Sequence, residues 1–377
     1  VKLNVVDSIT GKAVEGYDVT VTDQTGNQTE VTDGTFNGFA GRQYNYTIKC
    51  AGYMYKQGSF EIPEDTPSIS KTIKLAPSGS TAWDGSSMSE PEQVDGVYQI
   101  GTGAELAWLA NEVNVNKKGA INAALTADID LAGYSWTPVG NFNSIYAGSF
   151  DGQGHTIKNL SQNDISYSGI FGLAKGTISN LTVVGNITMS TKTAAGAIVG
   201  YLYQGTSDSP AKISNCVSKV DITYTGTNTS ALIGGIAGYS NTSSQSNTVI
   251  ENCVNYGTIK AENGGGVGGI IGSMISCNIY VKNSTNYGDI TAKTNVGGIL
   301  GNYNEYNPQR PACKIIACYN AGVVKGQTNV GGIAGYFKGN KSNNAEVEIK
   351  DCYSAGDVIC PSWSTKYVFA GYSQDMI

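Results

Sequence analysis

The pattern of apolar and polar positions repeats along the second half of the chain. Six copies of one unit follow each other from residue 177, at a period of roughly 30–40 residues, and most copies end in a sequence close to Gly-Gly-Ile-Ala-Gly-Tyr. The copies align on a column that is mostly cysteine and consists of Leu181, Cys216, Cys253, Ser284, Cys318 and Cys352. A fixed period of this length indicates one supersecondary unit that stacks on itself.

Each unit has the two-residue alternation of strands rather than the spacing of a helix. Isoleucine or valine stands three positions before the cysteine column and again six positions after it, and polar residues alternate with the apolar sites that follow. A glycine usually occupies the fourth position after the column, where we expect a bend. The pattern predicts about three short strands in each unit and a parallel β-helix, in which like residues of successive rungs stack at about 4.8 Å.

Two columns of this predicted β-helix carry polar or sulfur-containing side chains inward. Asn255, Asn286 and Asn320 stand two positions after the cysteine column in consecutive units, and we expect their amides to bond from rung to rung. The cysteines of the column are expected to be buried free thiols, because buried cysteine behaves as a small hydrophobe. Cys277 and Cys313 fall in loops between rungs, where a disulfide between them is an open alternative.

The first hundred residues have a different pattern. Residues 1–77 contain about seven alternating segments with Gly, Asn and Asp turns between them, which predicts a small Ig-like β-sandwich. Residues 78–100 open with a polar stretch and are expected to be a linker. Residues 101–114 have the apolar spacing of one amphipathic helix, N-capped near Thr102. We expect this helix to cap the open end of the β-helix, which would then occupy 101–377.

Composition excludes several classes of function. The chain of 377 residues has a net charge of −6, which argues against a nucleic-acid partner. No apolar run approaches the length of a membrane span, so we expect no membrane insertion. His155 is the only histidine and no C-x-x-C is present, so we expect neither a histidine-rich zinc site nor a thiol redox centre, and we assign no cofactor.

Two stretches resemble known families. Residues 123–188, which include DIDLAGYSWTPVG and SFDGQGHTIKNLS, resemble the opening coils of bacterial surface β-helix proteins, and the Gly-Gly-Ile-Ala-Gly-Tyr endings are similar to their GLUG repeats. This resemblance covers about 270 residues and implies a right-handed parallel β-helix on a secreted or cell-wall protein. Within residues 1–77, the run D-x-x-T-G-K-x-V-x-G-Y and a later A-G-Y resemble carboxypeptidase-regulatory-like and collagen-adhesin B-type modules.

The same resemblance raises enzymes as alternatives. GLUG repeats precede the peptidase domain of some IgA-cleaving metalloproteases, but the H-E-x-x-H zinc motif of those enzymes is absent here. Many parallel β-helices cleave polysaccharides, which would require paired carboxylates. Asp221, Asp289 and Asp357 share one outward column at separations of roughly 9–10 Å, near the upper limit for an inverting acid–base pair. We interpret this column as a solvated face.

Further acidic residues and the single histidine lie in the opening coils. Asp128, Asp130 and Asp151 are interpreted as turn and cap residues, with calcium ligation as the alternative. His155, in DGQGHTI, is interpreted as a structural turn residue, because no G-x-S-x-G nucleophile motif accompanies it. The sequence therefore predicts no catalytic residue and no metal ligand.

Tyrosines gather where the units end. The candidate ligand contacts lie at the Gly-Tyr corner or in the loop after it, and they are Tyr201, Tyr203, Tyr239, Tyr303, Tyr306 and Tyr336. Stacked units would place these corners along one edge, where exposed rings offer a flat apolar face and a hydroxyl to a sugar or a protein. The alternative is that the rings stack on each other and shield the core.

Together these observations lead us to expect an extracellular, non-enzymatic protein attached to the cell surface or cell wall. It would be an adhesin, or a module that binds a glycan or a host or bacterial surface protein. Two alternatives stay open: a polysaccharide-active β-helix enzyme, and a purely structural stalk of a longer surface protein. Because the chain has no initial methionine or signal peptide, we expect a mature or excised segment.

Overall fold

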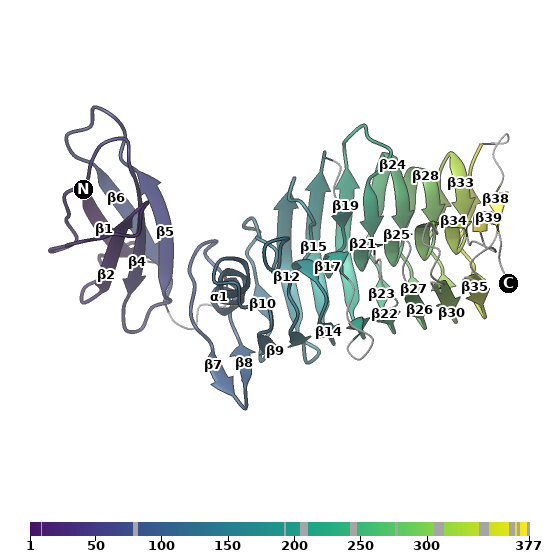
Figure 1. Ribbon diagram of the computed structural model, residues 1–377, viewed down its shortest axis with the longest axis horizontal. Helices are drawn as coiled ribbons and strands as arrows, with labels where there is room; N and C mark the ends of the chain where they lie inside the picture. Colours follow the sequence, from purple (N-terminus) through teal and green to yellow (C-terminus); the bar gives the residue numbers. More distant parts are fainter. Residues whose placement is uncertain are drawn as a thin grey trace.

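The computed structural model describes residues 1–374 apart from 9, 78–81, 192–193, 204–209, 242–246, 276–277, 305–312, 339–346, 362–365 and 368–369. The described chain is nearly all β, with one helix, so the all-β expectation is confirmed. Figure 1 shows a small β domain at the N-terminus and, beyond it, a long stack of strands that reaches the C-terminal end. In this stack most strands pair in parallel with a strand of the next repeat.

Two small sheets form the N-terminal domain. The described strands of this domain are β1 (Lys2–Asp7), β2 (Asp18–Asp23), β3 (Gln28–Thr29), β4 (Gln43–Lys49), β5 (Lys56–Glu61) and β6 (Ser70–Leu75). Strands β1 and β6 pair in parallel, and the order β3-β2-β4-β5 forms an antiparallel sheet. Side chains of both sheets, among them Leu3, Val21, Ile48 and Ile73, belong to one buried apolar cluster. Alternate residues of β1 and β4, with apolar residues of β2, β5 and β6, thus form the core of this domain.

In the segment that we expected to be a linker, 78–100, the described residues 82–100 are mostly folded. It contains β7 (Glu92–Val94) and β8 (Val97–Ile100), and β8 pairs in parallel with β9 (Asn122–Leu125) of the stack. Trp83 is buried against Trp136, with ring centroids 5.6 Å apart. The stack therefore begins before residue 101, because these apolar side chains and strand edges cover its first rung.

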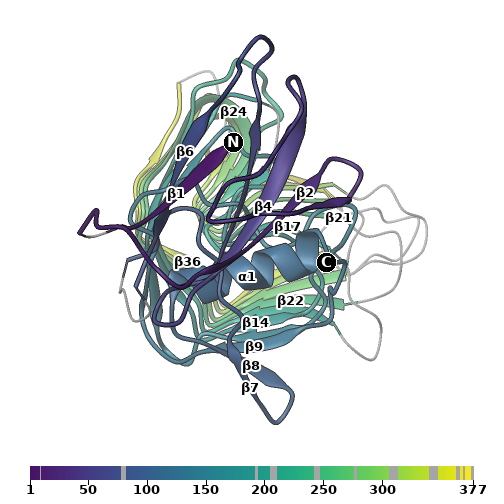
Figure 2. The same ribbon diagram turned by 90° about the vertical axis from the view of Figure 1, so that its left-hand side faces the viewer.

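The helix expected over 101–114 is confirmed as α1 (Gly103–Asn114). Thr102 is its N-cap and forms a capping box with Glu105, whose carboxylate accepts hydrogen bonds from the backbone N–H groups of Gly101 and Thr102. Its apolar face is part of the same core as the stack. In Figure 2 the helix crosses the N-terminal end of the stack. Within the described residues, no helix is long and apolar enough to cross a membrane.

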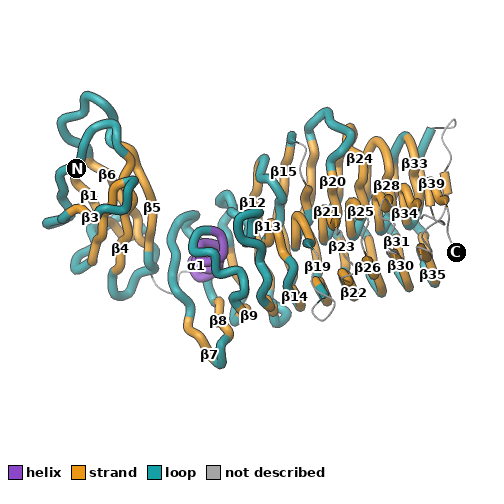
Figure 3. Tube along the Cα trace, viewed as in Figure 1, coloured by secondary structure: helices purple, strands orange, loops and turns teal. Residues whose placement is uncertain are grey.

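Three sheets run along the stack, and Figure 3 shows their strands following one another with loops between them. Sheet 1 contains β10 (Ile129–Asp130), β12 (Thr156–Asn163), β15 (Thr182–Met189), β16 (Ala194–Ala195), β19 (Val217–Tyr224), β20 (Leu232–Gly234), β23 (Val254–Asn255), β24 (Ile259–Gly268), β27 (Thr285–Asn286), β28 (Ile290–Gly297), β31 (Tyr319–Asn320), β32 (Val324–Lys325), β33 (Thr328–Gly331), β36 (Tyr353–Ser354), β37 (Val358–Ile359) and β38 (Lys366–Tyr367).

Sheets 2 and 3 complete each rung. Sheet 2 contains β7, β8, β9, β11 (Ser149–Asp151), β14 (Thr177–Ser179), β18 (Ala211–Ser214), β22 (Asn247–Glu251), β26 (Asn278–Lys282), β30 (Cys313–Ile316) and β35 (Val347–Lys350). Sheet 3 contains β13 (Phe171–Ala174), β17 (Val199–Leu202), β21 (Ala237–Asn241), β25 (Ile271–Ile275), β29 (Leu300–Asn304), β34 (Ala334–Lys338) and β39 (Ala370–Gln374). One repeat unit passes through all three sheets and thus makes one rung.

The register of the sheets matches the columns read from the sequence. In sheet 2, Ile213 pairs with Ile250, and Ile250 pairs with Val281. In sheet 1, Ile222 pairs with Ile259 in the same way. All five side chains are fully buried. Like residues therefore stack on like residues in the core, as the period of the sequence predicts.

The cysteine column is buried as expected. Cys216 and Cys253 have no exposed surface, Cys318 is 1% exposed, and Cys352 near the C-terminal end is half-buried. The prediction for Cys313 is wrong. This residue does not lie in a loop but in β30, buried and in register with Ile279 and Val347, because the strand of sheet 2 begins there. Its proposed pairing with Cys277 lies outside the described residues.

The predicted asparagine ladder is confirmed. The Nδ2 of Asn255 donates to the Oδ1 of Asn286 at 2.8 Å, and the Nδ2 of Asn286 donates to the Oδ1 of Asn320 at 2.8 Å. The ladder continues from Asn320 to the hydroxyl of Ser354 at 3.2 Å. The three amides are fully buried, so their polar groups are satisfied inside the stack.

The glycine before each corner residue has a packing reason. A Cβ at Gly272 would lie 2.4 Å from the backbone nitrogen of Ile233, and one at Gly301 would lie 2.3 Å from that of Val267. Both neighbours belong to sheet 1 of the preceding rung. Sheets 1 and 3 thus approach each other too closely at this edge for any side chain.

Candidate ligand-binding site

Three of the six predicted tyrosines belong to one aromatic group near the start of sheet 3. Tyr201 of β17 pairs in register with Tyr239 of β21, and their rings are 4.9 Å apart. The ring of Tyr203 lies 5.4 Å from that of Tyr201. Phe142 and Tyr167 from the preceding coils add rings at 6.3 and 5.8 Å from Tyr201. We call these five residues the Tyr201 cluster.

The Tyr201 cluster is a partly covered surface. Tyr201 is only 8% exposed, and its hydroxyl donates to the carbonyl of Asn241 at 3.3 Å. Phe142 is 62% exposed, whereas Tyr203 and Tyr239 are half-buried. Both alternatives raised by the sequence thus hold in part at this corner, because the rings stack on each other and still leave aromatic surface in solvent.

The predicted tyrosine edge does not continue along the stack. The column that holds Tyr201 and Tyr239 continues with Ser273 and Asn302 before it reaches Tyr336, which is half-buried. Asn302 donates from Nδ2 to the hydroxyl of Ser273 at 3.0 Å. In this column, two rungs without an aromatic residue therefore separate Tyr336 from the Tyr201 cluster.

The prediction that Tyr303 is an exposed loop residue is wrong. It lies in β29 and is fully buried, with its ring 5.6 Å from that of Phe337 and its backbone in register with Met274. Strand β29 continues to Asn304, so residue 303 keeps the inward phase of the alternation. Tyr306 lies outside the described residues.

The aspartate column has a structural role that the sequence did not reveal. The Oδ1 of Asp221 accepts the backbone N–H of Thr258 at 2.8 Å, and the Oδ1 of Asp289 accepts that of Val323 at 2.9 Å. Each carboxylate therefore bonds to the following rung, which corrects the interpretation of a merely solvated face. Asp357 is exposed in the same column.

The polar residues of the opening coils hold turns, as predicted. Asp130 accepts from the backbone of Ala132 at 2.8 Å, and Asp151 accepts from the backbone of Gln153 at 2.9 Å. The Oδ1 of Asp128 lies 3.4 Å from the Nδ1 of His155.

The backbone around these turns also affects the pKa of Asp128. Its carboxylate accepts the backbone N–H of Thr156 at 2.9 Å, and this bond, with a smaller contribution from His155, lowers the pKa of Asp128 below its ordinary value. Among the described residues, no group of three or more His, Cys, Asp or Glu side chains is arranged to hold a metal ion.

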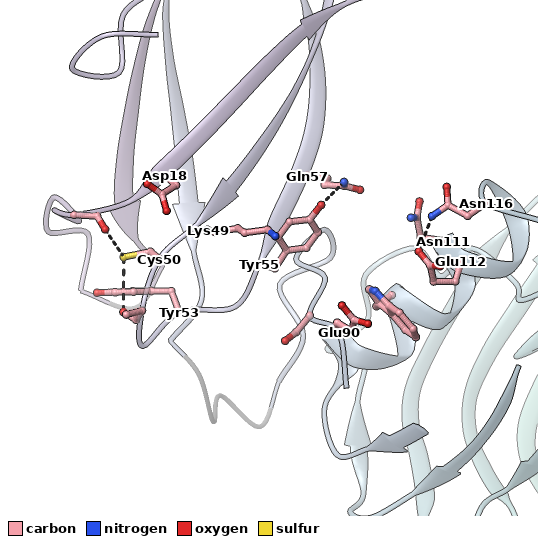
Figure 4. A pocket seen from close by; sticks show the side chains of 14 residues that line it. Asp18, Lys49, Cys50, Tyr53, Tyr55, Gln57, Glu90, Asn111, Glu112 and Asn116 are labelled. Atoms are coloured by element: carbon pink, nitrogen blue, oxygen red, sulfur yellow. Dashed lines mark hydrogen bonds between the residues drawn. The ribbon is translucent and has the colours of Figure 1, made fainter. Parts of the chain in front are cut away.

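A cleft of about 570 Å³ lies between the N-terminal domain and α1 (Figure 4). Lys49 and Tyr55 line it from the N-terminal domain, with the Lys49 ammonium 5.5 Å from the centre of the Tyr55 ring. Glu112 of α1 lines the other wall, but its carboxylate is already paired with Lys118 at 2.7 Å and with the amide of Asn116. The cleft therefore offers mixed polar groups without a converging set.

A second group of tyrosines was missed in the sequence. Tyr256, Tyr287, Tyr319 and Tyr353 lie on successive rungs of sheet 1, and we call them the tyrosine ladder. Neighbouring rings along it are 5.0, 6.3 and 5.7 Å apart. A signal was present, since all four stand at odd offsets from the cysteine column, where alternation turns side chains outward. The signal was obscured because the four tyrosines do not share one column of the alignment. Tyr256 and Tyr287 stand three positions after the cysteine column, whereas Tyr319 and Tyr353 stand one position after it.

Comparison with known proteins supports the fold. No protein-family model matches the chain, and no curated protein matches it. Among solved structures, the chain is similar to one described as a "putative immunoglobulin A1 protease from Bacteroides ovatus", with a TM-score of 0.55 and 24% sequence identity. The alignment covers 76% of this chain and 87% of that chain. At this level of identity the likeness concerns the fold alone.

Proposed function

We propose that this protein is an extracellular, non-enzymatic binding module at the cell surface or cell wall. In this proposal the stack is a right-handed parallel β-helix of GLUG-type repeats that displays the binding surface. The N-terminal domain is an Ig-like sandwich, similar to carboxypeptidase-regulatory-like modules, and acts as a spacer. A rigid repeat stack suits display, because each rung is held by its neighbours and the surface residues keep fixed positions.

The observation that carries the proposal is the Tyr201 cluster. Its rings are positioned by parallel strands and by each other, so little side-chain entropy is lost when a ligand packs against them. Phe142 supplies the most exposed apolar face, and the half-buried rings of Tyr203 and Tyr239 pack with it around Tyr201. This combination suits a glycan or a surface protein of a host or another bacterium.

The acidic side chains support a non-enzymatic reading. A glycosidase needs one carboxyl group to give up a proton and another to act on the sugar or on water. In Asp221 and Asp289, one carboxylate oxygen instead accepts a hydrogen bond from a backbone N–H of the next rung. They act as links between rungs, which favours binding over polysaccharide cleavage.

The test of the binding function uses the purified chain on arrays of glycans and host surface proteins. Replacing Phe142 and Tyr203 together by Ala should weaken capture of the ligand about tenfold, or about 1.4 kcal/mol. The control is Phe39→Ala, because Phe39 is 67% exposed but lies in the N-terminal domain. Equal losses in the two variants, or none in either, would count against the Tyr201 cluster as the binding surface.

Proteolysis is a second candidate, favoured only by the name of the similar structure. The same chain is therefore incubated with immunoglobulin A1 and with a panel of polysaccharides. We expect both to stay intact. Cleavage of either one that disappears in Asp289→Ala would overturn the non-enzymatic proposal in favour of a hydrolase.

A further inference from the structure

The tyrosine ladder is a continuous row of rings along the outside of the stack. Tyr256 and Tyr287 are stacked with an interplanar angle of 7°, and Tyr319 and Tyr353 with an angle of 2°. The two pairs meet edge to face, at 78° between Tyr287 and Tyr319. The row spans three rung steps, or roughly 14 Å at the usual strand spacing.

This row is unusually open to solvent. Tyr256, Tyr287 and Tyr353 are 51, 47 and 64% exposed, and Tyr319 is half-buried. They are three of the nine large apolar side chains that are exposed in the described residues, so exposed aromatic surface is concentrated on one line. A contiguous patch of exposed apolar side chains often marks an interaction surface.

The backbone beneath the row is fixed by the asparagine ladder. Asn255 directly precedes Tyr256, and its amide both donates to the carbonyl of Gly257 at 2.9 Å and accepts the N–H of Gly257 at 3.1 Å. Asn286 likewise precedes Tyr287 and bonds to Gly288 at 2.8 Å. The residues on either side of Tyr256 and of Tyr287 are thus tied to buried amides. The backbone that carries these two rings is fixed before any ligand arrives, which lowers the entropic cost of binding.

Small residues make room where the row changes column. In the last two rungs, Ala321 and Ala355 occupy the third position after the cysteine column, which Tyr256 and Tyr287 occupy in the earlier rungs. Tyr319 and Tyr353 stand two positions before these alanines and pair in register. The row therefore continues diagonally without a bulky side chain in its path.

Charges beside the row are of both signs. Lys219 lies over the ring of Tyr256, with its ammonium 5.9 Å from the ring centre. Further along the same rungs stand the exposed Asp221, Lys260 and Asp289. A surface with interspersed signs does not select an acidic or a basic ligand, and it provides donors and acceptors for hydroxyl groups.

We propose that the tyrosine ladder is a binding platform for a linear, uncharged oligosaccharide that lies along the stack axis. Sugar rings have apolar faces that pack on aromatic rings and hydroxyl rims that bond to the tyrosine hydroxyls and the flanking charges. A ligand that repeats along its length matches a surface that repeats at every rung. This extends the proposed binding function to a second surface and names its ligand class.

The size of the platform favours a sugar over a protein. Three tyrosines that are about half exposed and the half-buried Tyr319 offer at most roughly 400 Å² of aromatic surface. A stable protein partner covers about 800 Å² on each side. In Figure 2, β36 of the ladder and β21 of the Tyr201 cluster lie on opposite sides of the stack. The two surfaces are therefore separable by mutation.

The experiment titrates the purified chain with neutral gluco-, xylo- and manno-oligosaccharides of two, four and six units by calorimetry. We expect the affinity to increase with the length of the oligosaccharide until the sugar is as long as the row of tyrosines, roughly 14 Å. Replacing Tyr256 and Tyr287 together by Ala should weaken binding at least tenfold, whereas Tyr287→Phe, which keeps the ring, should retain most of it. Phe142→Ala is the matched control for an exposed aromatic residue elsewhere, and thermal melts check the fold of each variant.

The outcomes separate this inference from the proposed function. Sugar binding that survives the double substitution but is lost in Phe142→Ala overturns the ladder and leaves the Tyr201 cluster as the site. Capture of a protein or a proline-rich peptide on the ladder, without any sugar, overturns the ligand class. No binding to any glycan or protein overturns both proposals. Loss of sugar binding in the Tyr256 and Tyr287 double variant, with binding retained in Phe142→Ala, supports the binding platform.

Discussion

Tyr203 and Tyr303 lie one position apart when the units are aligned, yet one borders solvent and the other is core. Tyr203 follows the end of β17 and is half-buried. Tyr303 lies within β29, against Phe337 and in register with Met274. At the scale of the residue, the role of a ring is set by its phase in the alternation, because Met274, Tyr303 and Phe337 share one fully buried position, whereas the next position, that of Asn304, is half-buried.

This difference gives a stability prediction. Tyr303→Ala should lower the free energy of unfolding by about 3–5 kcal/mol, because it removes a large side chain from a fully buried site. Tyr203→Ala should lower it by less than about 1 kcal/mol. Denaturant titration followed by circular dichroism measures both. Equal midpoints for the two variants would contradict the buried position of Tyr303.

At the scale of the element, hydrogen-bonded side-chain columns hold the rungs together. Asn286 bonds to both neighbouring rungs inside the core. A second, exposed column links Asn180, Asn215 and Asn252 from rung to rung at 3.0 and 3.1 Å, and these residues have positive φ angles. The inner column satisfies buried groups, whereas the outer column sets the corner between sheets 2 and 1.

The two columns should respond differently to truncation. Asn286→Ala should cost about 1–3 kcal/mol of unfolding free energy, because the Oδ1 of buried Asn320 loses its donor from the rung before. Asn283 stands at the same position of the outer column in the next unit, with a φ of 50°, and Asn283→Ala should cost less, since Ala317 already occupies this position one rung further at a φ of 52°. Thermal denaturation of both variants gives the comparison. A larger loss for Asn283→Ala would refute this ranking.

Most of the rung structure and part of the candidate site, the tyrosines at 201, 203 and 239, were predictable from the sequence, whereas contacts between rungs were not. The inward columns at Cys216, Asn255 and Ile259 follow from alternation within one strand, which needs no knowledge of the neighbouring rung. The burial of Tyr303 depends on how far β29 extends, and the role of Asp289 depends on a backbone N–H that lies 34 residues further along the chain. Such contacts between rungs carry no local signal.

At the scale of the whole molecule, one buried ion pair ties the two domains together. Lys56 of β5 pairs with Asp84 at 3.0 Å, and their side chains are 9 and 14% exposed. The backbone N–H of Met88 also donates to the carbonyl of Tyr55, across the same joint. The N-terminal domain is therefore attached to the stack by side-chain and backbone contacts as well as by the continuity of the chain.

The joint should be sensitive to acid. Burial alone would raise the pKa of Asp84, but hydrogen bonds from Ser87 and the charge of Lys56 outweigh it and lower the pKa below its ordinary 3.8. The stabilisation is thus complete above pH 3.8 and is lost as the pH falls through the lower folded value. Small-angle scattering across this range should show the domains separating.

Asp84→Asn is the control for the acid response, because it removes the titrating group. Its scattering profile should be independent of pH in this range and should resemble the profile of the acidified parent. A parent whose dimensions do not change between pH 6 and pH 2 would show that Asp84 does not hold the joint.

The pairing of each rung with only its two neighbours has a mechanical consequence. A force that pulls on the C-terminal end loads the last rung first. The rungs on its N-terminal side keep their strand-pairing hydrogen bonds until the rung beyond them has detached. Each detachment would release roughly 30–40 residues, or about 100–140 Å of extended chain. Under tension the protein would lengthen stepwise and dissipate work at every step. The rungs nearer the N-terminus would stay folded and would keep any ligand that is bound to them.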